Sequence, residues 1–327
     1  MKNRVCIIVP HFGRFQNYFQ LFLKTCSYNP NFNWLIITDD GTSFDYPSNV
    51  MCIQKDFKQF KEEISSKFNF PISLDRPYKL CDYRPLYGYM FAEYLEGFTH
   101  WGHCDTDVIM GNLGKFINDD LLDSYDKIFR LGHLSIYRNT SEINSIALKP
   151  YQGCEIGKRI LQTPKNCWFD EEWDPVHNVS INRIFEAYGK RIYKDDLSLN
   201  ISFSYNRFVR GKFVGIENTS MPFGFEIEKY KDALYLWNKG NLYRYFLNKG
   251  ELVREDFPYM HLQQRPMKMH LAVLQQDCFQ IIPDEFIPFS FQQVITVNSF
   301  SKIPRPCKSW LKERLLWKRL KKKLHIK

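Results

Sequence analysis

The chain has 327 residues, of which 44% are apolar, 25% charged and 17% aromatic. This composition is typical of a globular protein and excludes a largely disordered one, and the length suits a large α/β domain with a substantial core. The net charge of +9 is concentrated in residues 308–327, which hold nine Lys or Arg and one Glu, so residues 1–307 carry only +1 and no nucleic-acid partner is expected.

The first 70 residues read as the start of a parallel α/β sheet. Runs of β-branched and other apolar residues alternate with segments whose apolar residues recur at helical spacing. The predicted elements are strands at 5–9, 34–38 and 50–53 and helices at 15–26 and 57–68. Ligands of such sheets bind beyond the carboxyl ends of the strands, so the loops after the first two strands are candidate site segments.

These two loops carry polar residues. The first strand closes with Pro10 and is followed by His11-Phe12-Gly13-Arg14, and the second ends in Asp39-Asp40-Gly41. Asp39 and Asp40 can contact a ligand, although Asp-Gly is equally a common turn pair.

A charged loop precedes the next predicted helix. Lys79, Asp82 and Arg84 come just before Pro85, which suits the first position of a helix with one apolar face over 86–98. Charged groups before a helix N-terminus can meet a nucleotide or an anion, whereas any one of them alone is more often a solvated or capping residue.

The sequence His103-Cys104-Asp105-Thr106-Asp107 ends the strand predicted at 98–104. In an extended backbone, residues two apart point to the same side, so Asp105 and Asp107 can offer oxygens to one hard cation such as Mn²⁺ or Mg²⁺. Asp-x-Asp is also common by chance, and a solvated turn is the competing interpretation.

Further strands are predicted at 127–131 and 134–137, and a helix at 179–188. Asp170 and Glu171 lie between Trp168 and Trp173, just before that helix. Acidic residues there favour the positive end of a helix, but carboxylates placed between tryptophans can also acquire the tuned pKa of a general base. No motif stands out in residues 190–257.

The segment 258–270 contains His261, Arg265 and Lys268. His261 can supply a third metal ligand, and the two cations can bind phosphate oxygens. A lone His at a strand end is more often structural, so the ligand role depends on its lying near Asp105 and Asp107.

Residues 308–327 have Trp and Leu on one face and Lys and Arg on the other. This pattern predicts a basic amphipathic helix suited to an anionic membrane surface, which the apolar face favours over a nucleic acid. The nine scattered cysteines contain no Cys-x-x-Cys pair, and no window is apolar enough to be a signal peptide or a spanning helix. We therefore expect a cytoplasmic protein that associates peripherally with the inner face of the cell membrane.

Taken in order, these motifs resemble those of a GT-A fold glycosyltransferase, over roughly residues 5–270. The segments 78–88 and 261–265 look more narrowly like those of bacterial capsule and O-antigen transferases. The resemblance implies a mixed, mainly parallel central sheet flanked by helices. It also implies a nucleotide-sugar-binding half over 1–125 and an acceptor-binding half over 126–307 of the same domain, which the basic tail 308–327 follows.

The resemblance also implies roles for the candidate residues. The metal ligands would be Asp105, Asp107 and His261. In an inverting enzyme either Asp170 or Glu171 would be the catalytic base, whereas a retaining enzyme needs no such base. The residues implied in binding the nucleotide and its phosphates are Pro10, His11, Phe12, Asp39, Lys79, Asp82, Arg84, Asp105, Arg265 and Lys268.

The expected donor is a nucleotide sugar, a UDP-hexose with galactose in its pyranose or furanose form as the candidate. The expected acceptor is a lipid-linked glycan in surface polysaccharide synthesis. One alternative is a nucleotidyltransferase acting on sugar phosphates, but that class usually has a glycine-rich loop after the first strand, and this loop has only Gly13. The other alternative function is that of a non-enzymatic membrane-binding protein.

Overall fold

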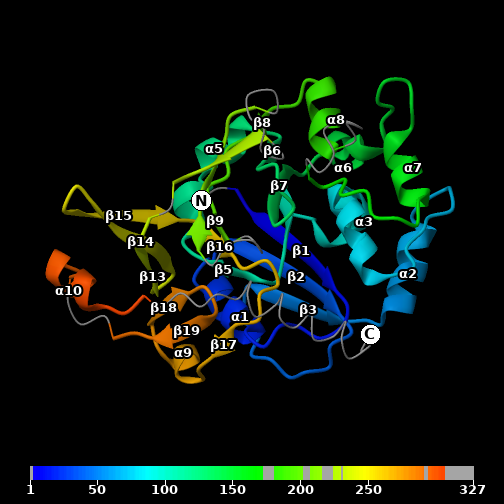
Figure 1. Cartoon of the computed structure of the whole chain (residues 1–327). Coiled ribbons are helices and arrows are strands. Elements are labelled where there is room, and N and C mark those ends of the chain that lie inside the picture. Colours follow the sequence, from blue (N-terminus) through cyan, green and yellow to red (C-terminus); the bar gives the residue numbers. More distant parts are fainter. Residues whose placement is uncertain are drawn as a thin grey trace, which may run out of the picture.

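The computed structural model describes residues 3–171, 180–201, 207–215, 224–229, 231–290 and 294–305. Its centre is a seven-stranded sheet in the order β3-β2-β1-β4-β7-β6-β8 (Figure 1). The strands are β1 (Val5–His11), β2 (Phe32–Thr38), β3 (Val50–Gln54), β4 (His100–Cys104), β6 (Lys127–Ile128), β7 (Leu134–Arg138) and β8 (Ile192–Tyr193). Only β7 runs antiparallel to its neighbours among these strands, which confirms the predicted mixed, mainly parallel sheet.

Helices cover both faces of this sheet, as the predicted fold class requires. Because side chains alternate along a strand, Val5, Ile7 and Val9 of β1 face one helical layer and Cys6 and Ile8 face the other. The first layer contains α1 (Phe19–Ser27), α4 (Leu113–Phe116) and α5 (Asp119–Ser124). The second contains α2 (Phe57–Ser66), α3 (Tyr87–Met90), α6 (Ser141–Ser145), α7 (Ile156–Gln162) and α8 (Ile181–Ala187).

Most predicted elements in the first 70 residues are confirmed within about two residues of their ends. The exception is α1, which begins at Phe19 and not at residue 15. The backbone N–H of Phe15 donates instead to Asp40 (2.9 Å), so the loop after β2 holds this residue outside the helix.

The long helix predicted from Pro85 to residue 98 is wrong. The segment forms short 3-10 turns around α3, and Phe91 (φ −120°) interrupts the helix. The 3-10 turns of this region are Pro77–Asp82, Arg84–Leu86 and Ala92–Tyr94. A Cβ atom on Gly88 would lie 2.2 Å from Nε1 of Trp101, so the chain rests directly on β4 here. The predicted apolar face is nevertheless buried in the core.

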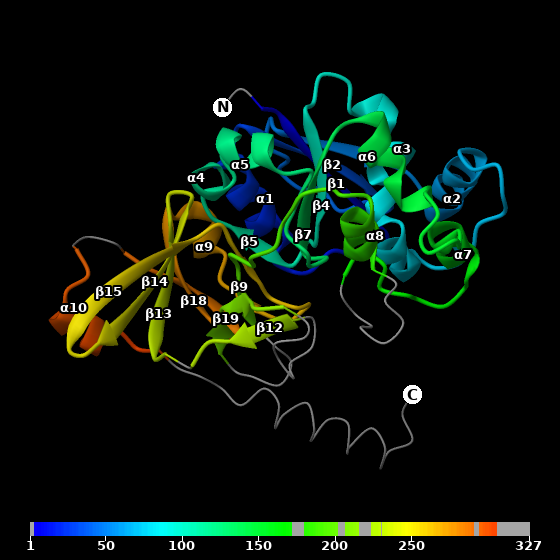
Figure 2. The ribbon, with the colours of Figure 1, turned by 90° about the horizontal axis from the view of Figure 1, so that it is seen from above.

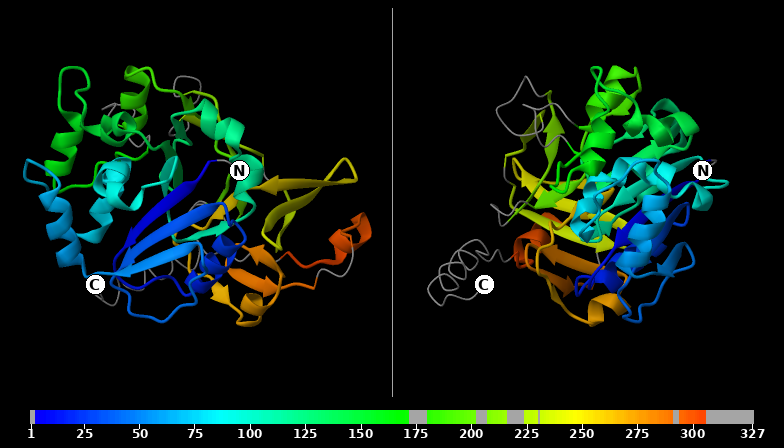
Figure 3. Two further views of the ribbon diagram at one scale, coloured as in Figure 1. Left: turned by 180° about the vertical axis from the view of Figure 1, so that it is seen from behind. Right: turned by 90° about the vertical axis from the view of Figure 1, so that its right-hand side faces the viewer.

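A second sheet, which the sequence did not predict, has the order β15-β14-β13-β18-β19-β17. Its strands are β13 (Ala233–Asn238), β14 (Asn241–Asn248), β15 (Glu251–Phe257), β17 (Lys268–Met269), β18 (Cys278–Ile282) and β19 (Glu285–Pro288), accompanied by α9 (Ala272–Gln275) and α10 (Val297–Lys302). Leu21 of α1 shares a core cluster with Trp237 and Phe279 of this sheet. The sheet lies beside the central one (Figure 2), at the opposite end of the molecule from α2 and α7 (Figure 3).

A small four-stranded sheet of order β10-β9-β16-β5 lies between these parts. It consists of β5 (Val108–Met110), β9 (Leu199–Ile201), β10 (Phe208–Val209) and β16 (Tyr259–His261), and β11 (Gly211–Phe213) pairs with β12 (Phe225–Ile227) nearby. In this sheet β16 runs antiparallel to β5 and parallel to β9. Strands that are 150 residues apart in the chain are thus neighbours at the end of β4.

The predicted helix at 308–327 lies outside the described residues. Within the described ranges, no helix combines the length and the apolarity needed to cross a bilayer. The eight cysteines of the described ranges are all free thiols. The division into a donor half and an acceptor half near residue 125 assigns roles to segments and stays a prediction.

Candidate active site

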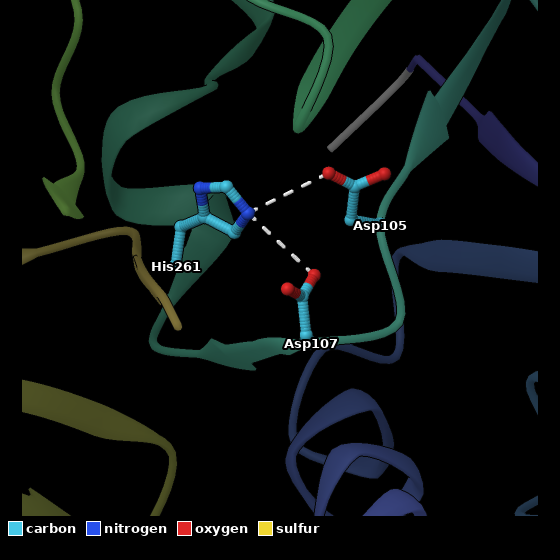
Figure 4. Close-up of side chains that lie close together, drawn as sticks. All are labelled: Asp105, Asp107 and His261. Atoms are coloured by element: carbon cyan, nitrogen blue, oxygen red, sulfur yellow. Dashed lines mark ion pairs between the residues drawn. The ribbon is translucent and has the colours of Figure 1, made fainter. Parts of the chain in front are cut away.

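Three side chains that could share one cation lie together at the carboxyl end of β4. Asp105 and Asp107 belong to the link between β4 and β5, and His261 ends β16. One ligand atom from each lies within 4.8 Å of the other two. Nε2 of His261 is 3.5 Å from Oδ2 of Asp105 and 3.6 Å from Oδ1 of Asp107 (Figure 4). Two carboxylate oxygens and an imidazole nitrogen are a donor set that fits Mn²⁺, or Mg²⁺ with water completing its shell.

Backbone pairing explains why His261 reaches this position. In the register of β16 and β5, His261 pairs with Val108, and the N–H of Leu262 donates to the carbonyl oxygen of Asp107 (2.9 Å). Gln263 and Gln264 then adopt positive φ angles of 49° and 51°, a conformation that costs free energy in residues other than glycine. This turn directs the N–H of Gln264 at the carboxylate of Asp107, to which it donates a hydrogen bond.

The acid and the imidazole of this cluster hold each other in the charged form. Burial raises the pKa of Asp107, but the charge of His261 and the N–H of Gln264 outweigh it, and the net pKa is lowered. Burial lowers the pKa of His261, whereas Asp107 and Asp105 raise it above the ordinary value. A cation held here would compete with a proton for the imidazole nitrogen of His261, whose pKa is raised, whereas the lowered pKa of Asp107 favours the ionised carboxylate that a cation needs.

Arg84, which begins the 3-10 turn Arg84–Leu86, joins the cluster of Asp105, Asp107 and His261 to a second group of charged side chains. One guanidinium nitrogen, Nη2, pairs with Asp105. The other, Nη1, lies 2.8 Å from Oδ2 of Asp170 and donates to the carbonyl of Gly132 at 3.1 Å. Arg84 therefore connects the cation cluster with one of the two predicted catalytic carboxylates.

Asp170 and Glu171 lie side by side but in different surroundings. Asp170 is only 1% exposed, and burial raises its pKa to about 7 although Arg84 opposes this. Glu171 is more accessible, its Oε1 accepts the N–H of Gly132 (3.0 Å), and burial raises its pKa. Asp170 is thus tied to Arg84, whereas Glu171 is held by the backbone of Gly132.

Gly132 is a site residue that the sequence did not single out. A Cβ atom at this position would lie 2.4 Å from Oδ2 of Asp170, 2.8 Å from Oε1 of Glu171 and 2.9 Å from Nη1 of Arg84. Only glycine lets these charged groups converge. The available signal was a glycine just beyond the strand predicted at 127–131, because glycine at a strand often marks a close approach of another group.

His133 is a second residue that the sequence missed. Its ring stacks on that of His261 with centroids 4.6 Å apart, and its Nδ1 is 2.8 Å from the hydroxyl of Tyr259. Burial lowers the pKa of His133 well below the ordinary value, so this ring is neutral. His133 therefore orients the ring of His261 without adding charge to the cluster.

The loops after β1 and β2 lie at the same edge of the sheet. Pro10 is the penultimate residue of β1, His11 stacks on Phe15 (4.3 Å between centroids), and the carboxylate of Asp39 accepts the N–H of Gly13 (2.6 Å). Burial lowers the pKa of His11, while Asp39 and Asp105 are close enough to oppose that shift. Asp40, by contrast, is buried and makes turn hydrogen bonds, one of them to Thr42.

Three predicted nucleotide-binding residues have buried side chains whose partners lie within the protein. Phe12 packs into the core against Phe57 and Phe60. Lys79 and Asp82 form a buried ion pair of 2.7 Å, in which Lys79 also donates to the carbonyls of residues 160 and 165. Asp82 also accepts the backbone N–H groups of residues 167 and 169. With their polar atoms bound inside the protein, Lys79 and Asp82 brace the segment that leads to Asp170.

The two cations that follow His261 have different positions. Arg265 is buried, and its backbone N–H donates to Leu262 (3.1 Å). Lys268 is exposed and begins β17, which pairs with β19 in the second sheet. Their contact with phosphate oxygens stays a prediction, as do the roles of the other site residues.

A family model described as a family of unknown function (DUF6625) matches residues 7–290. No curated protein matches the chain. Among solved structures, the galactosyltransferase LgtC in complex with donor and acceptor sugar analogs is similar at 8% identity and a TM-score of 0.33, covering 61% of this chain and 77% of that one. An active-site mutant of LgtC is similar at 9% identity and a TM-score of 0.34, covering 69% and 87%.

Proposed function

Because the chain belongs to a family whose function is unknown, DUF6625, we infer its activity from its own site, and we propose a metal-dependent glycosyltransferase that uses a nucleotide-sugar donor. The observation that carries the proposal is the cluster of Asp105, Asp107 and His261 at the carboxyl edge of the sheet, joined through Arg84 to Asp170. Asp170 and the next residue, Glu171, both have a raised pKa. A cation can neutralise the departing nucleoside diphosphate, and a base can take the proton of the acceptor hydroxyl in an inverting displacement.

The two aspartates and His261 would hold Mn²⁺ or Mg²⁺. When bound, the cation would neutralise the diphosphate of the leaving nucleotide. His11 and Asp39, at the ends of neighbouring parallel strands, are proposed to contact the nucleoside, with Pro10 shaping the loop. Arg265 and Lys268 are proposed to meet phosphate oxygens.

For the reaction itself, Glu171 is the proposed base. The acceptor hydroxyl oxygen bonds to the anomeric carbon, the bond from that carbon to the diphosphate breaks with its electron pair leaving on the nucleotide, and the hydroxyl proton passes to Glu171. This carboxylate is more accessible than Asp170, and its raised pKa brings it closer to neutral pH, where a general base works best. Asp170 is then a positioning residue, because it holds the guanidinium of Arg84, which also pairs with Asp105 of the cation cluster. Such a direct displacement inverts the anomeric configuration.

Nucleotide binding tests the class directly. We expect UDP together with Mn²⁺ to raise the Tm of the protein, because a ligand at about one hundred times its Kd adds about 2.7 kcal/mol to the free energy of unfolding. UDP with EDTA should give no shift, since the cation joins the diphosphate to the two aspartates. Differential scanning fluorimetry with UDP, other nucleoside diphosphates and UDP-galactose measures this. A shift with UTP and a sugar phosphate but none with any diphosphate would contradict the proposal and indicate a nucleotidyltransferase.

The tail suggests where the acceptor is. Residues 308–327, with a net charge of +8, are proposed to bind an anionic membrane surface and so to bring the enzyme to a lipid-linked glycan in bacterial surface polysaccharide synthesis. We expect the full chain to co-sediment with vesicles of phosphatidylcholine and phosphatidylglycerol at low salt, and a chain that ends at Pro306 to lose this binding. Phosphatidylcholine vesicles are the control. Equal binding of both chains would contradict the role of the tail.

A further inference from the structure

An exposed aromatic residue lies beside the proposed base. Tyr78, in the 3-10 turn Pro77–Asp82, is 58% exposed although it is a large aromatic residue. Its carbonyl accepts hydrogen bonds from Nδ2 of Asn166 (2.9 Å) and Sγ of Cys81 (2.7 Å), so its backbone is held firmly. Burial raises the pKa of Tyr78, and a hydrogen bond with Trp168 and the charge of Glu171 also act on it. The ring of Tyr78 is therefore exposed at the surface, and its backbone is bound to Asn166, two residues before Trp168.

Trp168 is held next to Tyr78 in a strained backbone conformation. Its φ of +48° lies in the left-handed region, which costs free energy for a residue with a side chain. The residues on either side, Cys167 and Phe169, both donate their backbone N–H groups to the buried carboxylate of Asp82. The carbonyl of Trp168 accepts the N–H of Glu171 at 3.1 Å. The buried ion pair thus maintains a turn that keeps Trp168 and Glu171 in fixed relation.

The surroundings of the two aromatic rings are polar. Nη2 of Arg76 donates to Oδ1 of Asn166 at 2.7 Å, and Asn166 in turn contacts the backbone of Tyr78. A sugar ring has an apolar face of C–H groups and a rim of hydroxyls. Tyrosine and tryptophan offer a flat apolar surface with a polar edge, and planar amide or guanidinium groups can bond the hydroxyls around it.

The nucleotide side of the site is separate from these rings. The charges that act on His11, where the nucleoside is proposed to bind, are Asp39, Asp40 and Asp105. The charges that act on Tyr78 include Glu171 and Arg84. Arg84 bridges Asp105 of the cation cluster and Asp170. Trp168 and Glu171 belong to the turn that contains Asp170, so this turn lies at the Asp170 end of the bridge.

Resting on the proposed glycosyltransferase function, we propose that Tyr78 and Trp168 form the acceptor subsite, an aromatic shelf on which the acceptor sugar ring stacks. The hydroxyl that attacks the donor is then directed at Glu171, three residues after Trp168. In this assignment the exposed ring of Tyr78 binds the acceptor. The buried pair of Lys79 and Asp82 holds Trp168 in its strained backbone conformation beside it.

The test compares three tyrosine variants by saturation-transfer NMR in the presence of Mn²⁺ and UDP. The probes are methyl β-D-galactopyranoside, methyl β-D-galactofuranoside and methyl α-D-glucopyranoside. For each glycoside that binds the wild-type protein, Tyr78→Ala should weaken binding about tenfold, whereas Tyr78→Phe should bind it like the wild type because the variant keeps the ring. Tyr89→Ala is the matched control, since Tyr89 is also exposed but bonds the backbone of Lys67. Calorimetry should give the same affinity for UDP and Mn²⁺ in all variants.

Unchanged glycoside binding in Tyr78→Ala overturns the shelf, as does an equal loss in Tyr78→Phe. Absence of saturation transfer to all three glycosides in wild-type protein that has bound UDP also overturns it. A wild-type protein that binds no nucleoside diphosphate with Mn²⁺ is the separate result that removes the proposed function itself.

Discussion

Replacing Asp107 by Asn should abolish the Mn²⁺-dependent binding of UDP and lower the release of UDP from UDP-galactose by about 10³-fold or more. The loss of several kcal/mol of charge stabilisation at about 1.4 kcal/mol per tenfold gives this magnitude. Asn keeps the size of the side chain and an oxygen that can accept the N–H of Gln264, so the turn after His261 should persist. Calorimetry with Mn²⁺ and UDP, and an assay of released UDP, measure the two effects.

Asp45→Asn is the matched control, because Asp45 is an exposed aspartate outside the site. It should bind Mn²⁺ and UDP like the wild type. Circular dichroism of Asp107→Asn should show the wild-type fold. A folded variant that retains metal-dependent UDP binding would show that Asp107 is not a ligand and would remove the central support for the proposed function.

Changing Glu171 to Gln should lower the turnover of UDP-galactose by about 10² to 10⁴-fold, the usual contribution of a general base. Binding of UDP and Mn²⁺ should be unchanged, because Glu171 is not one of the three clustered cation ligands. Since burial raises the pKa of Glu171 and the base must be ionised, wild-type turnover should fall as the pH is lowered through that raised pKa. Gln has no such titration, so this decrease should be missing from the residual activity of the variant.

Glu155→Gln is the control for this change, because Glu155, immediately before α7, forms an exposed pair with Lys158 and belongs to neither charged group of the site. Initial rates measured across a range of pH at saturating Mn²⁺ separate the two expectations. If Glu171→Gln keeps the wild-type rate and pH profile, the base is another group. The anomeric configuration of the product, read by NMR, should be inverted relative to the donor.

The sequence predicted the first part of the fold well, because β1, β2 and β3 are apolar runs closed by turn residues. It failed where packing overrides local pattern. The apolar face after Pro85 has helical spacing, yet the chain is broken into short turns where Gly88 rests on Trp101. The second sheet was not predicted, because strands such as β14 and β15 mix exposed and buried residues without strict alternation.

For the site, the types of side chain in the sequence predicted which residues lie together in the cation cluster, but they did not predict which charged side chains are turned into the protein interior. Asp105, Asp107 and His261 were expected to meet and do lie together, although only the pairing of β16 with β5 accounts for it. Lys79 and Asp82 have the chemistry of ligand-binding residues, but burial turns them towards each other. Nothing in the sequence around a charged residue distinguishes these two outcomes, since the deciding partners are backbone groups about 80 residues away.

Because His261 lies on a strand, its position in the site depends on the number of residues between β15 and β16 as well as on the identity of those residues. A single residue, Pro258, links β15 to β16, and its carbonyl accepts the N–H of Gly111 at 2.7 Å. No loop is therefore available here to absorb an inserted or deleted residue. Because neighbouring residues of a strand point to opposite faces, a shift of one position would turn His261 away from both aspartates while leaving all three residues in the sequence.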